Sequence, residues 1–352
     1  MEKNIKVLSK EEGGMLVEYN ERKVLLLHGS PYQMGYVHGK LFKDHVKEVV
    51  KTFIKGANEH KPGILEERLK LTEGYILDRY KEEMKGLAKG AELSEEEILL
   101  ANVFPEAFHC SGVALFGNAT ADGSLLHGRI LDYAVKSGLQ DHPAIILAKP
   151  DGYNGFINVT VAGLIGSVTG MNDKQIAIGE MGLSHDGNFA GVPMTLLVRR
   201  ALEEAHTLDE ALSIFKNSVR TCGYCYVISD GKIPDARALT CTYDVMDTAK
   251  PGEGLPGFPG SPPKDVVMIS KDERYVALLN AVNKYYGKID KDILIEIMKR
   301  PVSMESNLHN AVFEPQKLKM WLAIAQNPDV ENFQACYQPY YEYDMNELMK
   351  AF

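Results

Sequence analysis

The sequence predicts a layered α+β fold in which helices cover antiparallel sheets, and three observations predict it. The chain before Cys110 reads as mostly helical, whereas strand-like runs follow one another from Cys110 onward. Two helices and then further strands follow these runs, an order typical of helices packed on sheets. The 352 residues, 45% of them hydrophobic and 25% charged, suffice for a sizeable core in one large or two medium domains.

The first elements are predicted as a strand pair and a helix. Residues Met15 to His28 alternate in polarity, and Asn20-Glu21 is a turn between two strands. Ser30 has the position of an N-cap and Gln33 that of its capping-box partner, so a helix begins here. Its apolar side continues to Phe53, and glycines on a neighbouring face permit close packing.

A second amphipathic helix is expected from about Ile64 to Lys89, with Gly90 as its C-terminal cap. Ser94 and Glu97 form another capping-box pattern, which opens a short helix ending near residue 103.

A β-hairpin begins at Cys110. The strand-like run that this cysteine opens is reversed at Asp122-Gly123, and a second run follows to Tyr133. Further strands are expected at 144–148, 155–161, 167–182, 223–229, 238–243, 266–270, 310–313 and 320–325. Helices are expected at 193–206, 207–217, 274–285 and 291–299. The Gly/Pro-rich stretch Pro251 to Pro263 reads as a surface loop, a candidate lid.

Charge and hydropathy exclude several partners. The formal net charge is −9 and no long Lys/Arg run occurs, which argues against a nucleic-acid partner. The first twenty residues carry charges throughout, and no apolar run approaches the roughly 18 residues of a membrane span. We therefore expect a cytoplasmic protein without a membrane span.

The five cysteines are an odd, sparse set, which fits a reducing compartment. Cys222 and Cys225 lie in a strand-like run, where residues three apart point to opposite faces, so they do not converge on a metal. We expect no metal and no cofactor.

Cys110 is the candidate nucleophile. If the chain is cut just before it, its own α-amine, with a pKa near 7.7, serves as general base. An internal Cys110 would need a histidine, and His109 and His127 are the candidates. Asp132 would accept a hydrogen bond from the amine or thiol, and Arg129 would hold the thiolate and a substrate carboxylate or carbonyl.

These residues resemble a known family. A cysteine at a strand start, an Asp-Gly turn and His127-Gly128-Arg129-Ile130-Leu131-Asp132-Tyr133 are similar to the N-terminal nucleophile (Ntn) hydrolases of the acyl-coenzyme A:6-aminopenicillanate acyltransferase type, which are related to bile salt hydrolases and acid amidases. The run Gly29 to Gly39 resembles the family's pro-segment motif, and Gly170 to Lys174 resembles its turn before the next sheet strand.

The resemblance implies an αββα sandwich made as a precursor. Cys110 would attack the carbonyl of His109, giving a helical small chain of residues 1–109 that packs on a catalytic region of residues 110–352. Cys110 would then be the nucleophile, supported by Asp132 and Arg129, and would carry the acyl group of an amide or thioester.

The chain departs from the family pattern at three places. Ile130 stands where the family has asparagine, His109 precedes the cut where the penicillin enzyme has glycine, and Val267-Met268-Ile269-Ser270 stands where family members place Thr-Asn. In family members this Thr-Asn pair helps form the oxyanion hole, which needs about two hydrogen-bond donors. Asn172, Asn307 and Asn310 are the alternatives, of which we assign Asn172.

The function predicted is an amidohydrolase or acyltransferase acting on a small N-acylated amine or amino acid, with Ser111, Met171 and Met181 at the substrate. Two alternatives stay open: an uncleaved thiol hydrolase with a histidine base, and a catalytically silent relative that binds a ligand. The aromatic run Tyr340 to Tyr343 is explained by packing between helices or between chains, so a homo-oligomer also stays open.

Overall fold

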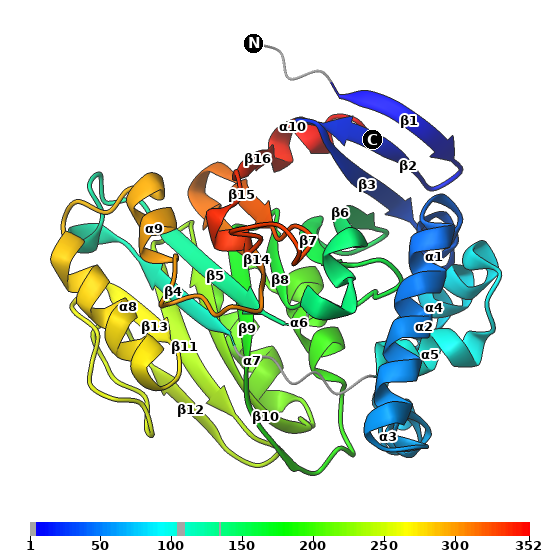
Figure 1. The fold of residues 1–352 in the computed structure, drawn as a ribbon, viewed down its shortest axis with the longest axis horizontal. Helices are drawn as coiled ribbons and strands as arrows, with labels where there is room; N and C mark the ends of the chain where they lie inside the picture. Colours follow the sequence, from blue (N-terminus) through cyan, green and yellow to red (C-terminus); the bar gives the residue numbers. More distant parts are fainter. Residues whose placement is uncertain (1–4, 104–109, 134) are drawn as a thin grey trace.

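Two β-sheets stacked face to face form the centre of the molecule, with helices on their outer sides (Figure 1). The computed structural model describes residues 5–103, 110–133 and 135–352, and for 184–187 the backbone alone. Helices α8 and α9 cover the smaller sheet, while α6 and α7 pack on central strands of the larger one. The blue and cyan helices of the N-terminal part lie beside the sheets.

The larger sheet has ten strands in the order β1-β2-β3-β6-β7-β8-β9-β10-β11-β12, and the smaller has six in the order β13-β4-β5-β14-β15-β16. All neighbours pair antiparallel except β3 and β6, which are parallel. The strands of the larger sheet are β1 (Lys6–Glu11), β2 (Gly14–Tyr19), β3 (Arg22–Gly29), β6 (Pro143–Pro150), β7 (Phe156–Val161), β8 (Thr169–Asn172), β9 (Ile176–Gly187), β10 (Cys222–Asp230), β11 (Asp235–Cys241) and β12 (Met246–Ala249). Those of the smaller sheet are β4 (Ser111–Leu115), β5 (Leu126–Asp132), β13 (Val266–Ile269), β14 (Asn307–Glu314), β15 (Lys319–Ile324) and β16 (Tyr341–Asp344).

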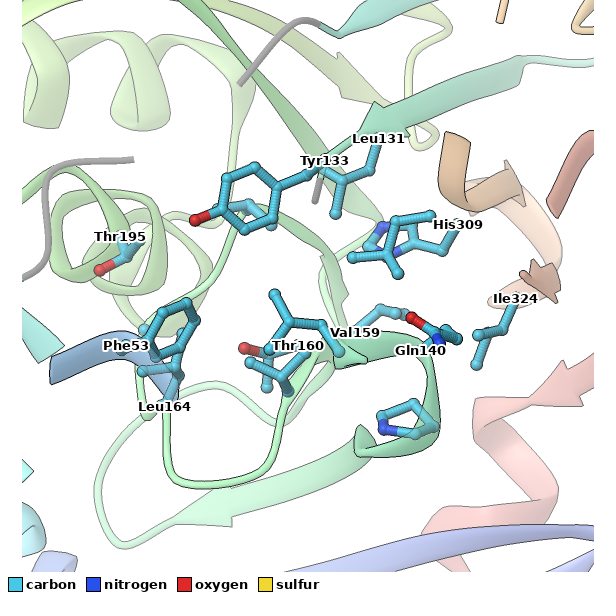
Figure 2. Close-up of a pocket in the computed structure, with 16 residues that line it drawn as sticks. Phe53, Leu131, Tyr133, Gln140, Val159, Thr160, Leu164, Thr195, His309 and Ile324 are labelled. Carbon is cyan, nitrogen blue, oxygen red and sulfur yellow. The ribbon is translucent and has the colours of Figure 1, made fainter. Parts of the chain in front are cut away.

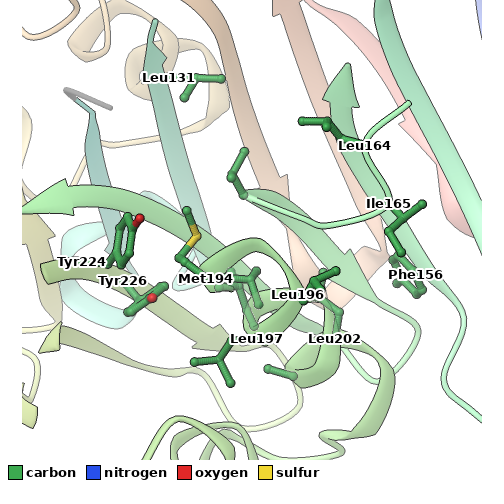
Figure 3. Packing of buried hydrophobic residues seen from close by; sticks show 14 of the residues in the cluster. Leu131, Phe156, Leu164, Ile165, Met194, Leu196, Leu197, Leu202, Tyr224 and Tyr226 are labelled. Carbon is green, nitrogen blue, oxygen red and sulfur yellow. The ribbon is translucent and has the colours of Figure 1, made fainter. Parts of the chain in front are cut away.

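The α-helices bury apolar stripes against these sheets. They are α1 (Pro31–Leu41), α2 (Lys43–His60), α3 (Ile64–Thr72), α4 (Asp78–Ala91), α5 (Glu95–Asn102), α6 (Met194–Glu204), α7 (Leu208–Asn217), α8 (Asp272–Tyr285), α9 (Lys291–Ile297) and α10 (Met345–Met349). Figure 3 shows the α6 side chains Met194, Leu196 and Leu197 packed in a cluster that includes Tyr224 and Tyr226 of β10. Burial of such side chains is the main stabilising contribution to the fold.

The predicted N-terminal helices form, but two of them are each divided. The helix expected to continue to Phe53 ends at Leu41, and α2 begins after Phe42. The long helix expected from Ile64 to Lys89 is interrupted by a short 3-10 turn, Glu73–Tyr75, between α3 and α4. Both capping boxes are present at α1 and α5.

Gly90 is not the C-terminal cap of its helix, as we expected. It lies inside α4 and faces α1, where an added Cβ would stand 2.2 Å from the Tyr36 backbone oxygen. The left-handed cap residue is Glu92. The glycines of α1 do permit close packing, because an added Cβ at Gly35 would stand 1.9 Å from the Glu83 oxygen of α4.

The β-hairpin that follows Cys110 is confirmed. β4 and β5 pair antiparallel, and Asp122-Gly123 lies in a longer connection than a tight turn would need. Strands β1, β12 and β16 and helix α10 were not predicted, because they are short and mostly half-buried or exposed.

All five cysteines are free and buried. Cys222 and Cys225 lie in one strand, β10, as predicted. Within the described ranges no three His, Cys, Asp or Glu side chains are grouped to hold a metal ion. No helix in the described part of the chain has the length and apolar character needed to cross a membrane.

Candidate functional site

Cys110 immediately precedes β4 and lies at the interior between the two sheets. Ser111 is opposite Ile130 in β5, so one further step of the register puts Cys110 opposite Leu131. The thiol is buried at 3% exposure and belongs to the inter-sheet core together with Met181. Burial raises the pKa of the Cys110 thiol to about 12, while the charge of Arg129 opposes this rise. The thiol of the uncut chain is therefore neutral.

Arg129 lies on β5 and is fully buried in the same inter-sheet space. Its Nε donates to the Val168 carbonyl at 3.3 Å, and its Nη1 donates to the carbonyl of Ile130. Its Nη2 lies 3.7 Å from Glu180 Oε2. The positive charge of this guanidinium favours a thiolate at Cys110.

Glu180 was missed by the sequence reasoning. It lies on β9 and is fully buried, and burial raises the pKa of its carboxyl to about 8 despite the nearby charge of Arg129. Among the described residues neither of its oxygens has a hydrogen-bond partner. The close approach of β9 to Arg129 of β5 depends on Gly179, because an added Cβ there would stand 2.7 Å from Arg129 Cδ. A glutamate amid apolar strand residues was the available signal.

Asp132 ends β5 and is tied into a hydrogen-bond network. Its Oδ1 accepts from the Met304 backbone N–H at 3.0 Å and from Asn307 Nδ2 at 3.1 Å, and its Oδ2 accepts from Arg274 Nη1 at 3.0 Å. Burial raises the pKa of its carboxyl to about 6, although these donors lower it. The Asp132 backbone N–H also hydrogen-bonds the Cys110 sulfur.

Ser111 faces the opposite side of β4 from Gly112, which contacts Met181. Its Oγ lies 2.6 Å from Ser270 Oγ and 3.5 Å from Arg274 Nη1, and it is fully buried. Ser111 therefore contacts Arg274 of α8 and Ser270 in the segment that leads into α8. Ser270 is thus next to the nucleophile strand, and the sequence analysis proposed no site role for either Ser270 or Arg274.

Asn172, which we assigned as a catalytic donor, makes its hydrogen bonds in this structure at the turn after β8 and to the end of α6. Its Nδ2 donates to the carbonyls of Leu202 and Ala205, and its Oδ1 accepts two backbone N–H groups of the following turn. It lies at the far end of β8, four residues from Val168 and so roughly 13 Å along the strand. Its role is to hold the β8–β9 turn against α6.

Met171 and Met181 have different surroundings. Met171, which we assigned to the substrate, packs in a core cluster with Ile157 and Tyr343, separate from the cluster that contains Cys110. Met181 lies beside Gly112, where an added Cβ would stand 3.0 Å from its sulfur. Met171 is opposite Ala177, so the two methionines lie on one face of the larger sheet, and their separation along β9 gives them different neighbours.

Asn307 and Asn310 already have hydrogen-bond partners. Asn307 Nδ2 donates to Asp132 Oδ1 and to Asn310 Oδ1, at 2.8 Å for the latter, and Asn310 Nδ2 donates to Ser303 Oγ at 3.4 Å. Asn307 therefore positions Asp132.

His127 lies opposite Ala114, four residues along β4 from Cys110. Its Nδ1 lies 2.8 Å from Ser229 Oγ, and burial lowers its pKa to about 3. An imidazole of such low pKa, four residues along the strand from Cys110, is both a weak base and distant from the thiol. His109 and the bond before Cys110 lie outside the described residues.

An apolar pocket begins beside the nucleophile. Leu131, opposite Cys110, and Val168, whose carbonyl accepts from Arg129, both line it, and Figure 2 shows Leu131, Tyr133 and His309 around its interior. Its volume is about 40 Å³, room for roughly three waters. The remaining lining is Phe53, Leu139, Gln140, Pro143, Val159, Thr160, Val161, Leu164, Gly166, Thr195, Leu308 and Ile324.

Comparison with known proteins agrees with this arrangement. Residues 120–236 match the model of the family described as acyl-coenzyme A:6-aminopenicillanic acid acyl-transferase. This match confirms the predicted family resemblance. The matched region includes Arg129 and Asp132.

Two sequence relatives and one solved structure illustrate the resemblance. Protein dcd1B of Dictyostelium discoideum is 25% identical over 346 residues, covering 87% of this chain and 69% of the relative. The acyl-coenzyme A:6-aminopenicillanic-acid-acyltransferase 40 kDa form of Emericella nidulans is 30% identical over 188 residues, covering 50% and 51%. The Caenorhabditis elegans ortholog of N-acylethanolamine-hydrolyzing acid amidase superposes with a TM-score of 0.50 at 14% identity, covering 67% of this chain and 99% of that one. The fold is the Ntn-hydrolase sandwich, as predicted.

Proposed function

We propose that this protein is a cysteine-dependent amidohydrolase or acyltransferase that forms a thioester on Cys110. The observation that carries the proposal is the buried Cys110 thiol at the start of β4, on which the charge of Arg129 acts and whose register neighbour Leu131 lines an apolar pocket. A charge that favours the thiolate and a pocket for an apolar chain are what transfer of an acyl group to sulfur requires.

The first step is cleavage of the chain at Cys110. The thiol adds to the carbonyl carbon of His109, a C–S bond forms as the C–N bond breaks, and the thiol proton passes to the departing nitrogen. Water then hydrolyses this thioester, which leaves a carboxylate on His109 and a free thiol and α-amine on Cys110.

In the reaction that follows, the α-amine takes the thiol proton as sulfur attacks the acyl carbonyl of the substrate. The C–N bond breaks, the amine departs with that proton, and the acyl group stays on sulfur. Water completes a hydrolysis, and a second amine completes an acyl transfer. Asp132, held by Asn307 and Arg274, is within reach of the amine because its own backbone N–H contacts the sulfur.

The acyl group is expected to be apolar and unbranched. The pocket beside Leu131 is narrow and mostly lined by aliphatic and aromatic side chains. Each buried CH₂ contributes about 0.8 kcal/mol to binding. A thin acyl chain therefore fits better than a ring system.

Intact mass and single-residue variants test the proposal. The wild type is expected to give two fragments, residues 1–109 and 110–352, and Cys110→Ala one full-length species without hydrolysis of acyl amides. A slow acyl substrate should add its acyl mass to the fragment that begins at Cys110. An active, uncut wild type would contradict the cleavage, and equal or undetectable hydrolysis in both proteins would favour a ligand-binding relative.

A further inference from the structure

The geometry points to Lys271 as the residue that selects the leaving amine, favouring N-acyl amino acids whose carboxylate it binds. This inference rests on the proposed function and names its substrate class. Lys271 follows β13, which pairs with the nucleophile strand β4 on the side away from β5 (Figure 1).

The register of β13 and β4 brings Lys271 beside Cys110. Ile269 is opposite Gly112, and the contact of Ser270 Oγ with Ser111 Oγ at 2.6 Å continues this register. One further step of this register, beyond the end of β13, places Lys271 opposite Cys110. Cys110 is thus flanked by Leu131 and the apolar pocket on one strand, and by a lysine on the other.

The Lys271 side chain extends toward the larger sheet, on the same side as the thiol. Its Nζ donates to the Leu183 carbonyl of β9 at 2.6 Å. Burial raises the pKa of the Cys225 thiol on β10, and Lys271 is a positive charge near enough to oppose this rise. An ammonium has three donors, so two remain for a ligand.

A polar cavity opens on this side of the nucleophile. Its volume is about 470 Å³, and it is lined by Lys271, Ser270, Leu183 and the Gly/Pro-rich loop at Pro256 to Pro259. This size is within the range of small-molecule sites. This cavity is more polar than the narrow pocket at Leu131. An N-acyl amino acid likewise has an apolar acyl chain on one side of its amide and a charged carboxylate on the other.

The distances also fit an α-amino acid. The carboxylate carbon of such a leaving group is three bonds from the carbonyl carbon that Cys110 attacks. Neighbouring strands lie roughly 5 Å apart, so a carboxylate displaced by that spacing comes beside Lys271. A lysine–carboxylate hydrogen bond contributes more than a neutral one, about 1.5–3 kcal/mol.

Two carboxylates restrict the side chain of the leaving amino acid. Asp247 and Asp272 line the same cavity, together with the hydroxyls of Thr240 and Thr242. A second acidic group on the substrate would meet these like charges. We therefore expect neutral or basic amino acids to be preferred over aspartate and glutamate.

The test compares N-octanoylglycine with N-octanoylethanolamine, which share the acyl chain and differ in the carboxylate. Binding is measured by calorimetry on the Cys110→Ala chain, so no turnover is needed. We expect N-octanoylglycine to bind at least about tenfold more tightly. Adding Lys271→Met should remove this difference, Lys271→Arg should retain most of it, and Lys264→Met, an exposed lysine outside the cavity, should leave it unchanged.

Hydrolysis by the wild type and Lys271→Met separates this inference from the proposed function. A higher KM for N-octanoylglycine alone, with ethanolamide kinetics unchanged, supports a carboxylate site, whereas equal loss on both substrates indicates that Lys271 is a structural tether. Equal binding of the two ligands to Cys110→Ala would overturn the inference even if the wild type hydrolyses both. Selective binding without any hydrolysis would overturn the proposed function and Lys271's selection of a leaving amine, and would leave only its carboxylate-binding site standing.

Discussion

Arg129 Nη2 lies 3.7 Å from Glu180 Oε2, and both side chains are fully buried. Burial raises the pKa of Glu180 to about 8, so in the folded chain this carboxyl keeps its proton near neutral pH. Its pKa in the unfolded chain is about 4.5. Between these two values the folded state binds an extra proton, and the free energy of unfolding falls as pH rises, by up to about 1.4 kcal/mol per pH unit.

Glu180→Gln should remove this dependence, because the amide resembles the protonated carboxyl and does not titrate. The test compares the urea midpoint of the Cys110→Ala protein with that of the same protein carrying Glu180→Gln. We expect similar midpoints at pH 5, and a higher midpoint for the Glu180→Gln protein at pH 8. The Cys110→Ala background keeps the chain uncut in the comparison. Parallel pH profiles for the two proteins would contradict the raised pKa.

A second buried ion network joins the N-terminal helices to the sheet sandwich. Arg199 of α6 donates to Glu83 Oε1 and Oε2 at 2.8 and 2.6 Å and to Glu203 Oε1 at 2.8 Å. Arg199→Met should lower the free energy of unfolding by about 3–5 kcal/mol, because it leaves the buried Glu83 without its cation, whereas Glu203 keeps an ion pair with Arg79. Denaturant unfolding measures this loss.

Arg200 is the matched control, since its ion pair with Glu204 is partly exposed. Arg200→Met should lower the free energy of unfolding by less than about 1 kcal/mol. Equal losses in the two variants would show that the buried network has no special contribution. The loss in Arg199→Met should also shrink at low pH, where protonated carboxyls need no cation.

Much of the fold could be predicted from local patterns, and the site only in part. The Ser30 and Ser94 capping boxes and the strand run after Cys110 follow from short-range chemistry, so sequence reasoning located them. The breaks at Phe42 and Glu73–Tyr75 carry no proline, and the apolar pattern continues across them.

The candidate site depends on contacts between segments distant in sequence. Glu180 and Arg274 reach β5 only because the sheets stack and α8 covers the smaller one, a relation that no local motif encodes. Asn172 shows how a local pattern leaves a role open. An asparagine after Gly-Met has the same local pattern whether it caps a turn or serves a site, and its four hydrogen bonds assign it to the turn.

The α1–α4 crossing gives a prediction about packing. An added Cβ at Gly35 would overlap the Glu83 backbone oxygen, which cannot rotate away. Gly35→Ala should therefore destabilise the chain by at least about 1–3 kcal/mol in thermal or urea unfolding. Gly56→Ala is the control, because this glycine of α2 has open space around it and alanine favours a helix by up to about 1 kcal/mol. A neutral Gly35→Ala would mean that the two helices can separate at little cost.

The apolar pocket gives a prediction about acyl-chain length. Thr160 is half-buried and lies in the lining near Leu164 and Phe53 (Figure 2), away from the Leu131 end beside Cys110. Thr160→Trp should fill the outer part of the pocket and displace the last carbons of a long acyl chain. Losing about two buried CH₂ groups costs roughly 1.6 kcal/mol, or about fifteenfold in kcat/KM.

The measurement compares octanoyl and acetyl amides of one amine on the wild type and Thr160→Trp. We expect the large loss with the octanoyl amide alone, because an acetyl group does not extend beyond the Leu131 end. Lys51→Trp, an exposed aromatic substitution on α2 next to Phe53, controls for added surface area and should leave both rates unchanged. If the octanoyl and acetyl amides lose activity equally, the acyl chain does not occupy this pocket. The acyl chain would then extend from Cys110 toward the Lys271 side, and the leaving amine would lie on the Leu131 side.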